Sequence, residues 1–291
     1  MCDNDSFDDM IQYELKKKEL SRRGFGALTL GAGLFAMLPP VANAAEVKES
    51  EVEIKTPDGT CDAHFVHPAS GTAPGVVVWP DIFGLRPAFR QMGKRLAESG
   101  YSVLTINPFY RTKKAPTSTT TAFDDSTRAT LMGLAGSLNE KTAFTDAKAF
   151  VDWLDKQAPV DKKRKMGTTG YCMGGPLVMR TAATMPARVG AGATFHGGGL
   201  VTDKPDSPHL LVPKIKAHFL FAIADNDDMK EPESKNVLRE SFAKAKLATP
   251  EIEVYKGAQH GWCPPDSRAY DQASAEKAWG RLLELFKTSL A

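Results

Sequence analysis

The chain has almost no excess of charge of either sign. Among its 291 residues, 37 are Lys or Arg and 35 are Asp or Glu, which gives a formal net charge of +2. A chain this close to neutral has no general attraction for nucleic acid or for an anionic membrane, so we expect neither as a partner. Its 42% hydrophobic and 25% charged residues are close to the averages for globular proteins. This composition excludes collagen-like, coiled-coil and wholly disordered chains.

The sequence also has little that could span a membrane. The uncharged run 24–40 has 17 residues, includes four glycines and ends in Pro39-Pro40, whereas a spanning helix needs about 20 apolar residues. Arg22-Arg23 before this run and the small residues 41–44 after it are typical of a bacterial twin-arginine signal peptide. We therefore expect export by the twin-arginine machinery, removal of residues 1–44, a periplasmic or secreted location, and no membrane span in the processed chain.

Residues 45–291 contain no internal repeat and no interdomain linker, and we expect them to form one domain. Short β-rich runs alternate in them with amphipathic helical segments. This alternation predicts an α/β fold, of the α/β-hydrolase kind, with a mostly parallel central sheet flanked by helices on both faces. The turn Pro57-Asp58-Gly59 predicts an opening hairpin. The expected strands are 52–55, 61–66, 75–79, 102–106, 166–170, 190–195, 217–222 and 252–255.

Residues 112–141 do not follow this alternation. They are polar and rich in Thr and Ser at first, then weakly helical over 124–136. Insertions of this kind commonly lie over the carboxyl ends of parallel strands, where ligands bind. We therefore expect this segment to lie near a ligand site.

Cysteine is scarce, and its number matters. The chain has four cysteines, and without residues 1–44 three remain: Cys61, Cys172 and Cys263. An odd number in an oxidising compartment leaves at least one thiol unpaired. The chain lacks Cys-x-x-Cys and His-x-x-x-His spacings, so neither a zinc site formed by Cys172, Cys263 and histidines nor any other metal or cofactor is expected.

The segment Gly170-Tyr171-Cys172-Met173-Gly174-Gly175 follows an expected strand and precedes an expected helix. It has the Gly-x-nucleophile-x-Gly pattern of a nucleophile elbow, with cysteine where serine is usual. Glycines suit this strained turn because neighbouring backbone comes too close for side chains. A helix N-terminus lowers a thiol pKa and stabilises an oxyanion, so Cys172 is a candidate nucleophile. The alternative is that Cys172 is a small apolar filler in a glycine-rich turn.

Candidate partners follow in the chain order of this elbow, which is nucleophile, acid and histidine. After the strand 217–222 we expect a loop at 224–228, which carries Asp225, Asp227 and Asp228. His260 is the only histidine in the segment after the strand 252–255. A thiol needs a base to become a thiolate, and the base needs a carboxylate to hold its tautomer. Loops at adjoining strand ends could supply all three groups.

The other histidines are weaker candidates. His196 also follows a strand and precedes glycines, but it lies between the nucleophile and the acid, which is the wrong order for the base. The remaining four are expected to be structural or solvated; they are His64, His67, His209 and His218.

These motifs together resemble the dienelactone hydrolase family of the α/β-hydrolase fold, and the resemblance covers most of residues 50–290. The motifs that carry it are Trp79-Pro80-Asp81-Ile82-Phe83-Gly84-Leu85, Gly100-Tyr101, Asn107-Pro108-Phe109-Tyr110-Arg111, the Cys172 elbow and Gly257-Ala258-Gln259-His260-Gly261.

The resemblance implies a catalytic triad of Cys172, His260 and Asp227, the last because the family places its acid third after a small residue. It also implies an oxyanion hole formed by the backbone N–H groups of Ile82 and Met173. The positions that would bind substrate agree with the family only in part. Asp81 stands where lactonases of the family carry glutamate, and Arg128 matches an arginine that holds a substrate carboxylate. The aromatic residues expected after that arginine appear as Met132 and Ala135.

The sequence thus predicts an exported carboxylic ester hydrolase that cleaves a small ester or lactone, like a carboxymethylenebutenolidase. Two alternatives remain. One is a binding protein that uses the same cleft without turnover, since fold does not determine function. The other is a thiol-redox protein in which Cys172 exchanges with Cys61 or Cys263.

Overall fold

The computed structural model describes residues 38–118 and 125–291. The predicted signal segment therefore lies, apart from its last seven residues, outside the described residues. Within the described ranges, no helix is both long enough and apolar enough to cross a membrane.

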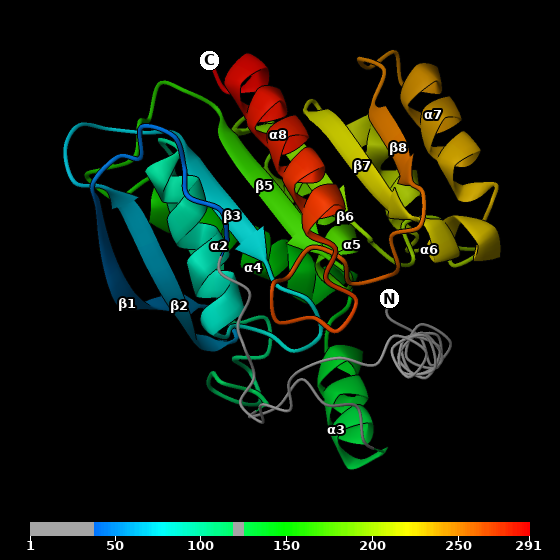
Figure 1. The fold of residues 1–291 in the computed structure, drawn as a ribbon, viewed down its shortest axis with the longest axis horizontal. Helices are drawn as coiled ribbons and strands as arrows, with labels where there is room; N and C mark the ends of the chain where they lie inside the picture. Colours follow the sequence, from blue (N-terminus) through cyan, green and yellow to red (C-terminus); the bar gives the residue numbers. More distant parts are fainter. Residues whose placement is uncertain (1–37, 119–124) are drawn as a thin grey trace, which may run out of the picture.

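The described residues form one eight-stranded sheet in the order β1-β2-β4-β3-β5-β6-β7-β8 (Figure 1). The strand β2 is antiparallel to both of its neighbours, and the strands from β4 onward in this order run parallel. The predicted α/β fold with a mostly parallel sheet is confirmed. The strands are β1 (Val47–Thr56), β2 (Gly59–Pro68), β3 (Gly75–Trp79), β4 (Ser102–Ile106), β5 (Met166–Tyr171), β6 (Val189–Phe195), β7 (His218–Ala224) and β8 (Glu251–Tyr255).

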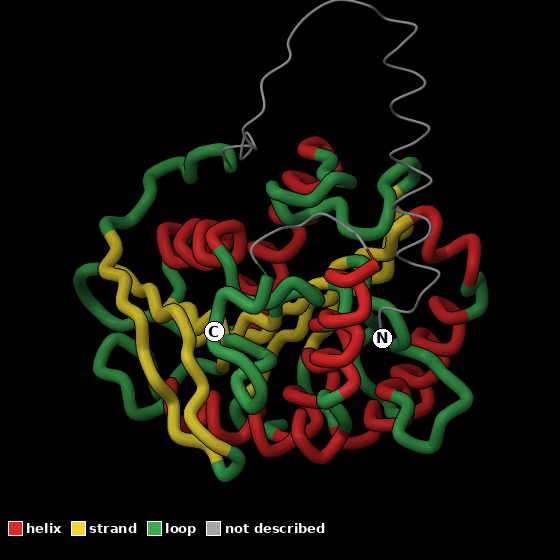
Figure 2. The backbone as a smooth tube through the Cα atoms, turned by 90° about the horizontal axis from the view of Figure 1, so that it is seen from below, coloured by secondary structure: helices red, strands yellow, loops and turns green. Residues whose placement is uncertain are grey.

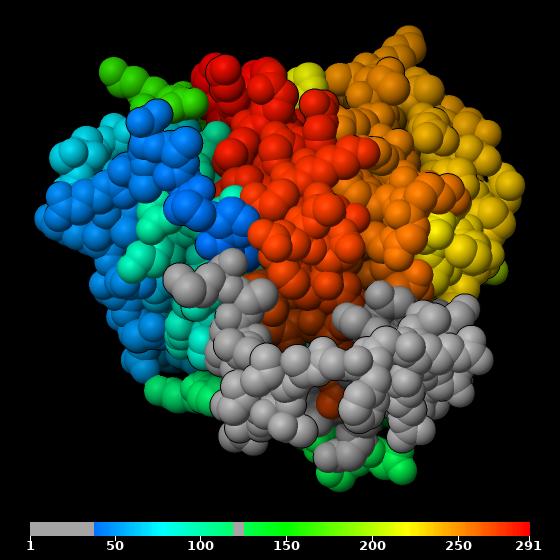
Figure 3. Space-filling view, viewed as in Figure 1, coloured from blue at the N-terminus to red at the C-terminus, as the bar shows by residue number. Residues whose placement is uncertain are grey.

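Helices cover both faces of this sheet, as Figure 2 shows from below. One apolar core lies under α2 (Pro87–Glu98) and α8 (Gln272–Ser289), and α8 covers the middle of that face in Figure 3. The other core lies under α4 (Glu140–Leu154), α5 (Gly174–Thr184) and α7 (Ser234–Lys244). Successive strand residues alternate between these two cores, which explains why β3 is apolar along its whole length.

The predicted hairpin is confirmed, and it is longer than expected because charged residues continue β1 along the open edge of the sheet. Such charged edge residues oppose pairing with a second sheet. The expected loop at 224–228 is wrong, since α6 (Asp225–Lys230) begins there. Asp and Asn are usually read as turn formers, but negative charge in a first turn also favours a helix.

The segment that breaks the alternation contains α3 (Asp125–Gly136), close to its expected helical range. In Figure 1 this helix lies below the sheet, beyond the carboxyl ends of β3 and β5. The short helix η1 (Pro208–Lys214) follows β6.

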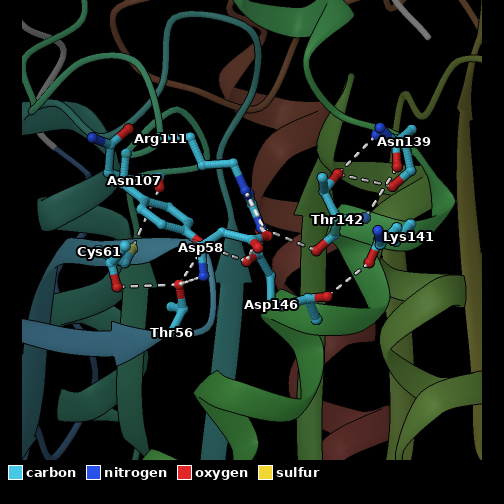
Figure 4. Close-up of polar contacts among 12 residues, drawn as sticks. Thr56, Asp58, Cys61, Asn107, Arg111, Asn139, Lys141, Thr142 and Asp146 are labelled. Carbon is cyan, nitrogen blue, oxygen red and sulfur yellow. Dashed lines mark hydrogen bonds and ion pairs between the residues drawn. The ribbon is translucent and has the colours of Figure 1, made fainter.

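A buried polar cluster joins the hairpin to the helical layer (Figure 4). Asp146 on α4 is 1% exposed, and its carboxylate accepts hydrogen bonds from Arg111 at 2.7 and 2.8 Å and from the Tyr110 hydroxyl at 2.7 Å. Arg111 also reaches Asp58 in the hairpin turn at 2.6 Å. Because a buried carboxylate is costly unless it is paired, this cluster holds the hairpin in one position against α4.

We expect Arg111→Met to lower the free energy of unfolding by about 3–5 kcal/mol, because it leaves the Asp146 carboxylate buried without a cation. Urea denaturation followed by circular dichroism measures this change. Lys148→Met is the matched control, because it removes a cation that pairs with Asp152 on α4, the helix that also carries Asp146. That ion pair is exposed and should contribute less than about 1 kcal/mol. Equal losses in the two variants would contradict the role of burial.

Candidate active site

Cys172 occupies a sharp turn between β5 and α5. Its φ is +52°, a left-handed conformation that is strained for a residue with a side chain. The flanking glycines are required by close contacts. A Cβ on Gly170 would lie 2.3 Å from the Gly174 carbonyl oxygen, and one on Gly175 would lie 2.8 Å from the Gly197 Cα. The backbone geometry is therefore that of the nucleophile elbow predicted from the sequence.

The turn that follows β3 lies directly against the start of α5. A Cβ on Gly174 would lie 2.4 Å from the Trp79 carbonyl oxygen and 2.9 Å from that of Pro80. Ile82 and Met173, whose amides are the predicted oxyanion hole, belong to these two adjoining turns. Donors from separate segments can stabilise a single oxyanion only when such turns come together.

His260 and Asp227 come together at the same edge of the sheet. The Asp227 carboxylate oxygens lie 2.8 and 3.0 Å from His260 Nδ1, and His260 is 2% exposed. The His260 backbone N–H donates to the side-chain oxygen of Asn226 at 2.8 Å. A carboxylate at Nδ1 holds the proton on that nitrogen, so that Nε2 carries the lone pair of the ring and has the character of an acceptor.

The neighbouring aspartates have other partners. Asp225 accepts from Lys256 Nζ at 2.9 Å and from the Gly257 backbone N–H at 3.0 Å, which lowers its pKa. Asp228 forms an ion pair with Lys235 at 2.5 Å. Of the three aspartates in this segment, Asp227 is thus the one whose carboxylate contacts the imidazole.

His196 was set aside on chain order, and the structure brings it into the site. Its ring packs edge-to-face on His260, with centroids 5.1 Å apart, and on Trp262 at 5.3 Å. It is 0% exposed, its φ is +41°, and neither ring nitrogen has a hydrogen-bond partner among the described residues. Burial lowers its pKa well below the ordinary value. The sequence signal was the glycine run after a strand, which marks a turn but says nothing of packing.

Asp81 lies in the turn after β3, and its carboxylate forms an ion pair with Arg86. Arg86 bonds both Asp81 oxygens at 2.6 and 2.9 Å and both Asp266 oxygens at 2.6 and 2.9 Å. Burial opposes this cation, but the two carboxylates hold the pKa of Arg86 above its usual value. Asp81 as a contact to substrate remains a prediction. Neither Arg86 nor Asp266 stood out in the sequence.

Arg128 lies on α3, half-buried, and its predicted contact with a substrate carboxylate remains a prediction. No three His, Cys, Asp or Glu side chains within 38–118 and 125–291 are placed to hold a metal ion together.

The described chain contains three cysteines. Cys61 and Cys263 are free and buried, and burial raises the pKa of both thiols. Cys172 is also buried, at 4% exposed, in the turn described above. Neither Cys61 nor Cys263 is therefore paired with Cys172. Both thiols have low reactivity, because a buried thiol with a raised pKa rarely forms the thiolate.

Comparison with known proteins agrees with this geometry. The family model described as "Dienelactone hydrolase family" matches residues 61–290. The chain belongs to the dienelactone hydrolase family. A relative from Escherichia coli (strain K12) is 30% identical over 223 residues, which cover 75% of this chain and 78% of that protein. The carboxymethylenebutenolidase of Rhodococcus opacus is 27% identical over 241 residues, covering 81% of this chain and 90% of that enzyme.

Solved structures of the dienelactone hydrolase family agree in fold. A crystal structure from Klebsiella pneumoniae has a TM-score of 0.72 at 23% identity and covers 83% of this chain and 99% of its own. At this identity the likeness concerns the arrangement of sheet and helices, and the chemistry must be argued from the side chains.

The buried imidazole of His196 predicts a pH dependence of stability. The folded chain keeps this ring neutral, whereas the unfolded chain takes up a proton below about pH 6.5. The free energy of unfolding should therefore be highest above that pH and fall below it, by up to about 1.4 kcal/mol per pH unit for one proton. His196→Phe should flatten this slope in urea titrations between about pH 6.5 and 5.5.

His218→Phe is the control for this substitution, because His218 is exposed. His64, whose pKa is also lowered by burial, accounts for slope that remains in the variant. An unchanged slope in His196→Phe would show that its ring is already protonated or solvated in the folded chain.

Proposed function

We propose that the chain hydrolyses an ester or lactone bond of a small substrate with Cys172 as nucleophile, His260 as base and Asp227 as the orienting acid. The observation that carries this proposal is the contact of Asp227 with His260 Nδ1, at the sheet edge where the strained Cys172 turn lies. Family membership and relatives named carboxymethylenebutenolidase support the same reaction class.

In the first half of the reaction, Nε2 of His260 takes the thiol proton and the Cys172 thiolate attacks the substrate carbonyl carbon. The negative oxygen that forms is stabilised by the N–H groups of Ile82 and Met173. The imidazolium, held by Asp227, then gives its proton to the leaving alkoxide, and the C–O bond breaks to leave a thioester on Cys172.

In the second half, His260 removes a proton from water, and the hydroxide attacks the thioester carbonyl. The C–S bond breaks, the thiolate recovers the proton from His260, and the acid is released. The reaction requires Cys172 as a thiol, so assays on residues 45–291 should contain a reductant to prevent oxidation of that thiol.

Replacing the nucleophile tests the proposal directly. Cys172→Ala should lower kcat/KM for small aryl esters and lactones by about 10⁴-fold or more, because no other group can form the acyl-enzyme. Mass spectrometry of the wild-type chain mixed with an activated ester should show one acyl group on the peptide that contains Cys172. Full turnover in Cys172→Ala would contradict the proposal. Wild-type protein that binds esters without becoming acylated would favour the alternative of a binding protein without turnover.

The acid is tested by two matched substitutions in α6. Asp227→Asn should lower kcat by about 10³–10⁴-fold, because the His260 tautomer is no longer held. Asp225→Asn makes the same chemical change two residues away, at a carboxylate that contacts Lys256 and Gly257, and should cost only a few-fold. Equal losses would contradict the assignment of Asp227.

We also propose that the chain is exported with residues 1–44 as a twin-arginine signal, on the evidence of Arg22-Arg23 and the segment that follows them. Replacing both arginines by lysine in the full chain should leave unprocessed protein in the cytoplasm, measured by cell fractionation and intact mass. Wild-type chain that keeps residues 1–44 after expression in the producing bacterium would overturn this proposal. The matched control is Lys17→Arg, which changes a basic residue upstream of the pair.

A further inference from the structure

A cavity of about 90 Å³ runs beside α5, between this helix, the segment that joins α3 to α4, and the segment that follows β6. Met173, the residue after Cys172, lines one part of the cavity, and Arg180, two turns further along α5, lines another. The walls include apolar side chains of Leu138, Pro176 and Leu177. The cavity therefore combines a hydrophobic channel with a cation, and it includes a residue of the predicted oxyanion hole.

The charge of Arg180 is poorly compensated. Its side chain is 8% exposed, its nearest carboxylate is that of Asp206 at 3.7 Å, and Asp206 is itself 44% exposed. One terminal nitrogen donates to the Asp206 backbone carbonyl at 3.2 Å, and Nε has no partner among the described residues. Burial lowers the pKa of Arg180. A guanidinium in this state lacks the bidentate anion that buried arginines normally have.

Other buried arginines of the chain show the contrast. Arg86 bonds two carboxylates, with four N–O distances from 2.6 to 2.9 Å. Arg95 bonds both oxygens of Glu276 at 2.6 Å, and the half-buried Arg188 bonds both oxygens of Asp155 at 2.8 and 3.0 Å. Arg180 is thus a buried cation with only a distant carboxylate partner and a cavity at its side. Lys204 and Asp206 also line that cavity.

The position of Arg180 relates the cavity to the reacting carbon. Met173, Leu177 and Arg180 recur at helical spacing and therefore share one face of α5. Seven residues correspond to about 10 Å along a helix axis. Helical side chains generally lean toward the N-terminus, which for a long side chain at position 180 is the direction of Cys172. A carbonyl at Cys172 and an anion at Arg180 would be joined by a short aliphatic chain.

We propose that this cavity holds the acyl chain of the substrate, that Arg180 binds a carboxylate at the far end of that chain, and that the preferred substrates are monoesters of linear dicarboxylic acids. The proposal rests on the proposed function of Cys172. It assigns the charge selectivity to Arg180 on the nucleophile helix, where the channel walls accept methylene groups. Asp206 competes weakly for the same guanidinium.

Two esters of matched shape test the proposal. The anionic ester is the mono-4-nitrophenyl ester of adipic acid, and the neutral one is 4-nitrophenyl 6-methylheptanoate, in which an isopropyl group replaces the carboxylate. The ratio of their kcat/KM values, corrected for spontaneous hydrolysis, should favour the anionic ester by about tenfold or more in the wild-type chain, the effect of one good charge-assisted contact. In Arg180→Met the ratio should fall to about one through a higher KM for the anionic ester.

Further variants separate charge from folding. Arg180→Lys should keep part of the preference, because it retains the charge without the forked donors. Asp206→Asn should increase the preference, because it removes the competing carboxylate from an exposed position that tolerates substitution. Arg188→Met, which removes an arginine that is already paired, should leave the ratio unchanged. Thermal unfolding checks that each variant is folded.

A binding measurement separates this proposal from the proposed function. Calorimetry with adipate, which cannot acylate the protein, should show binding to Cys172→Ala and at least tenfold weaker binding to the Cys172→Ala, Arg180→Met double variant. Adipate binding without hydrolysis of either ester would overturn the catalytic role while supporting the cavity assignment. Hydrolysis with equal rates for both esters, or a preference that survives Arg180→Met, would overturn the cavity assignment alone.

Discussion

The close approach of backbone around Cys172 is the constraint on which the candidate active site depends. Gly170, Gly174 and Gly175 allow β5, the turn after β3 and the segment after β6 to meet at distances that no Cβ would permit. This approach directs the chain into the left-handed turn that carries Cys172. It also brings together the turns of Ile82 and Met173. A side chain at any of these glycines would separate the turns on which an oxyanion site depends.

Buried charge is the second theme of this structure. Asp146 is matched by Arg111 and Tyr110, and Arg86 is matched by Asp81 and Asp266, so that each charge has geometrically good partners. These clusters hold the hairpin and the turn after β3 in place, because breaking either cluster would leave a buried charge without a partner and without water. Arg180 differs from these clusters, because its nearest carboxylate lies at 3.7 Å and is itself 44% exposed. This difference is the observation behind the proposed carboxylate subsite.

Local signals in the sequence were sufficient for most of the fold. Apolar runs such as 75–79 located the buried strands because both faces of a parallel sheet are covered. The glycine pattern around Cys172 located the elbow because the pattern lies within six residues, even though Gly174 and Gly175 meet backbone from Trp79 and Gly197. The segment at Asp225 was misjudged, since Asp and Asn suit both a turn and the first turn of a helix, and tertiary contacts decided between them.

By itself, the sequence determined the fold class, the position of the Cys172 turn and the narrow choice of partners in Asp225–Asp228 and His260. Four features were decided only in the tertiary structure. They are the pairing of His260 with Asp227, the burial of His196 beside it, the ion pair of Asp81 with Arg86, and the burial of Arg180 with a distant carboxylate. The reason is physical. Strand and turn patterns can be recognised within a few neighbouring residues, whereas the partner of a buried polar group is set by which distant segments share the same space. Arg86 and Asp266 are 180 residues apart.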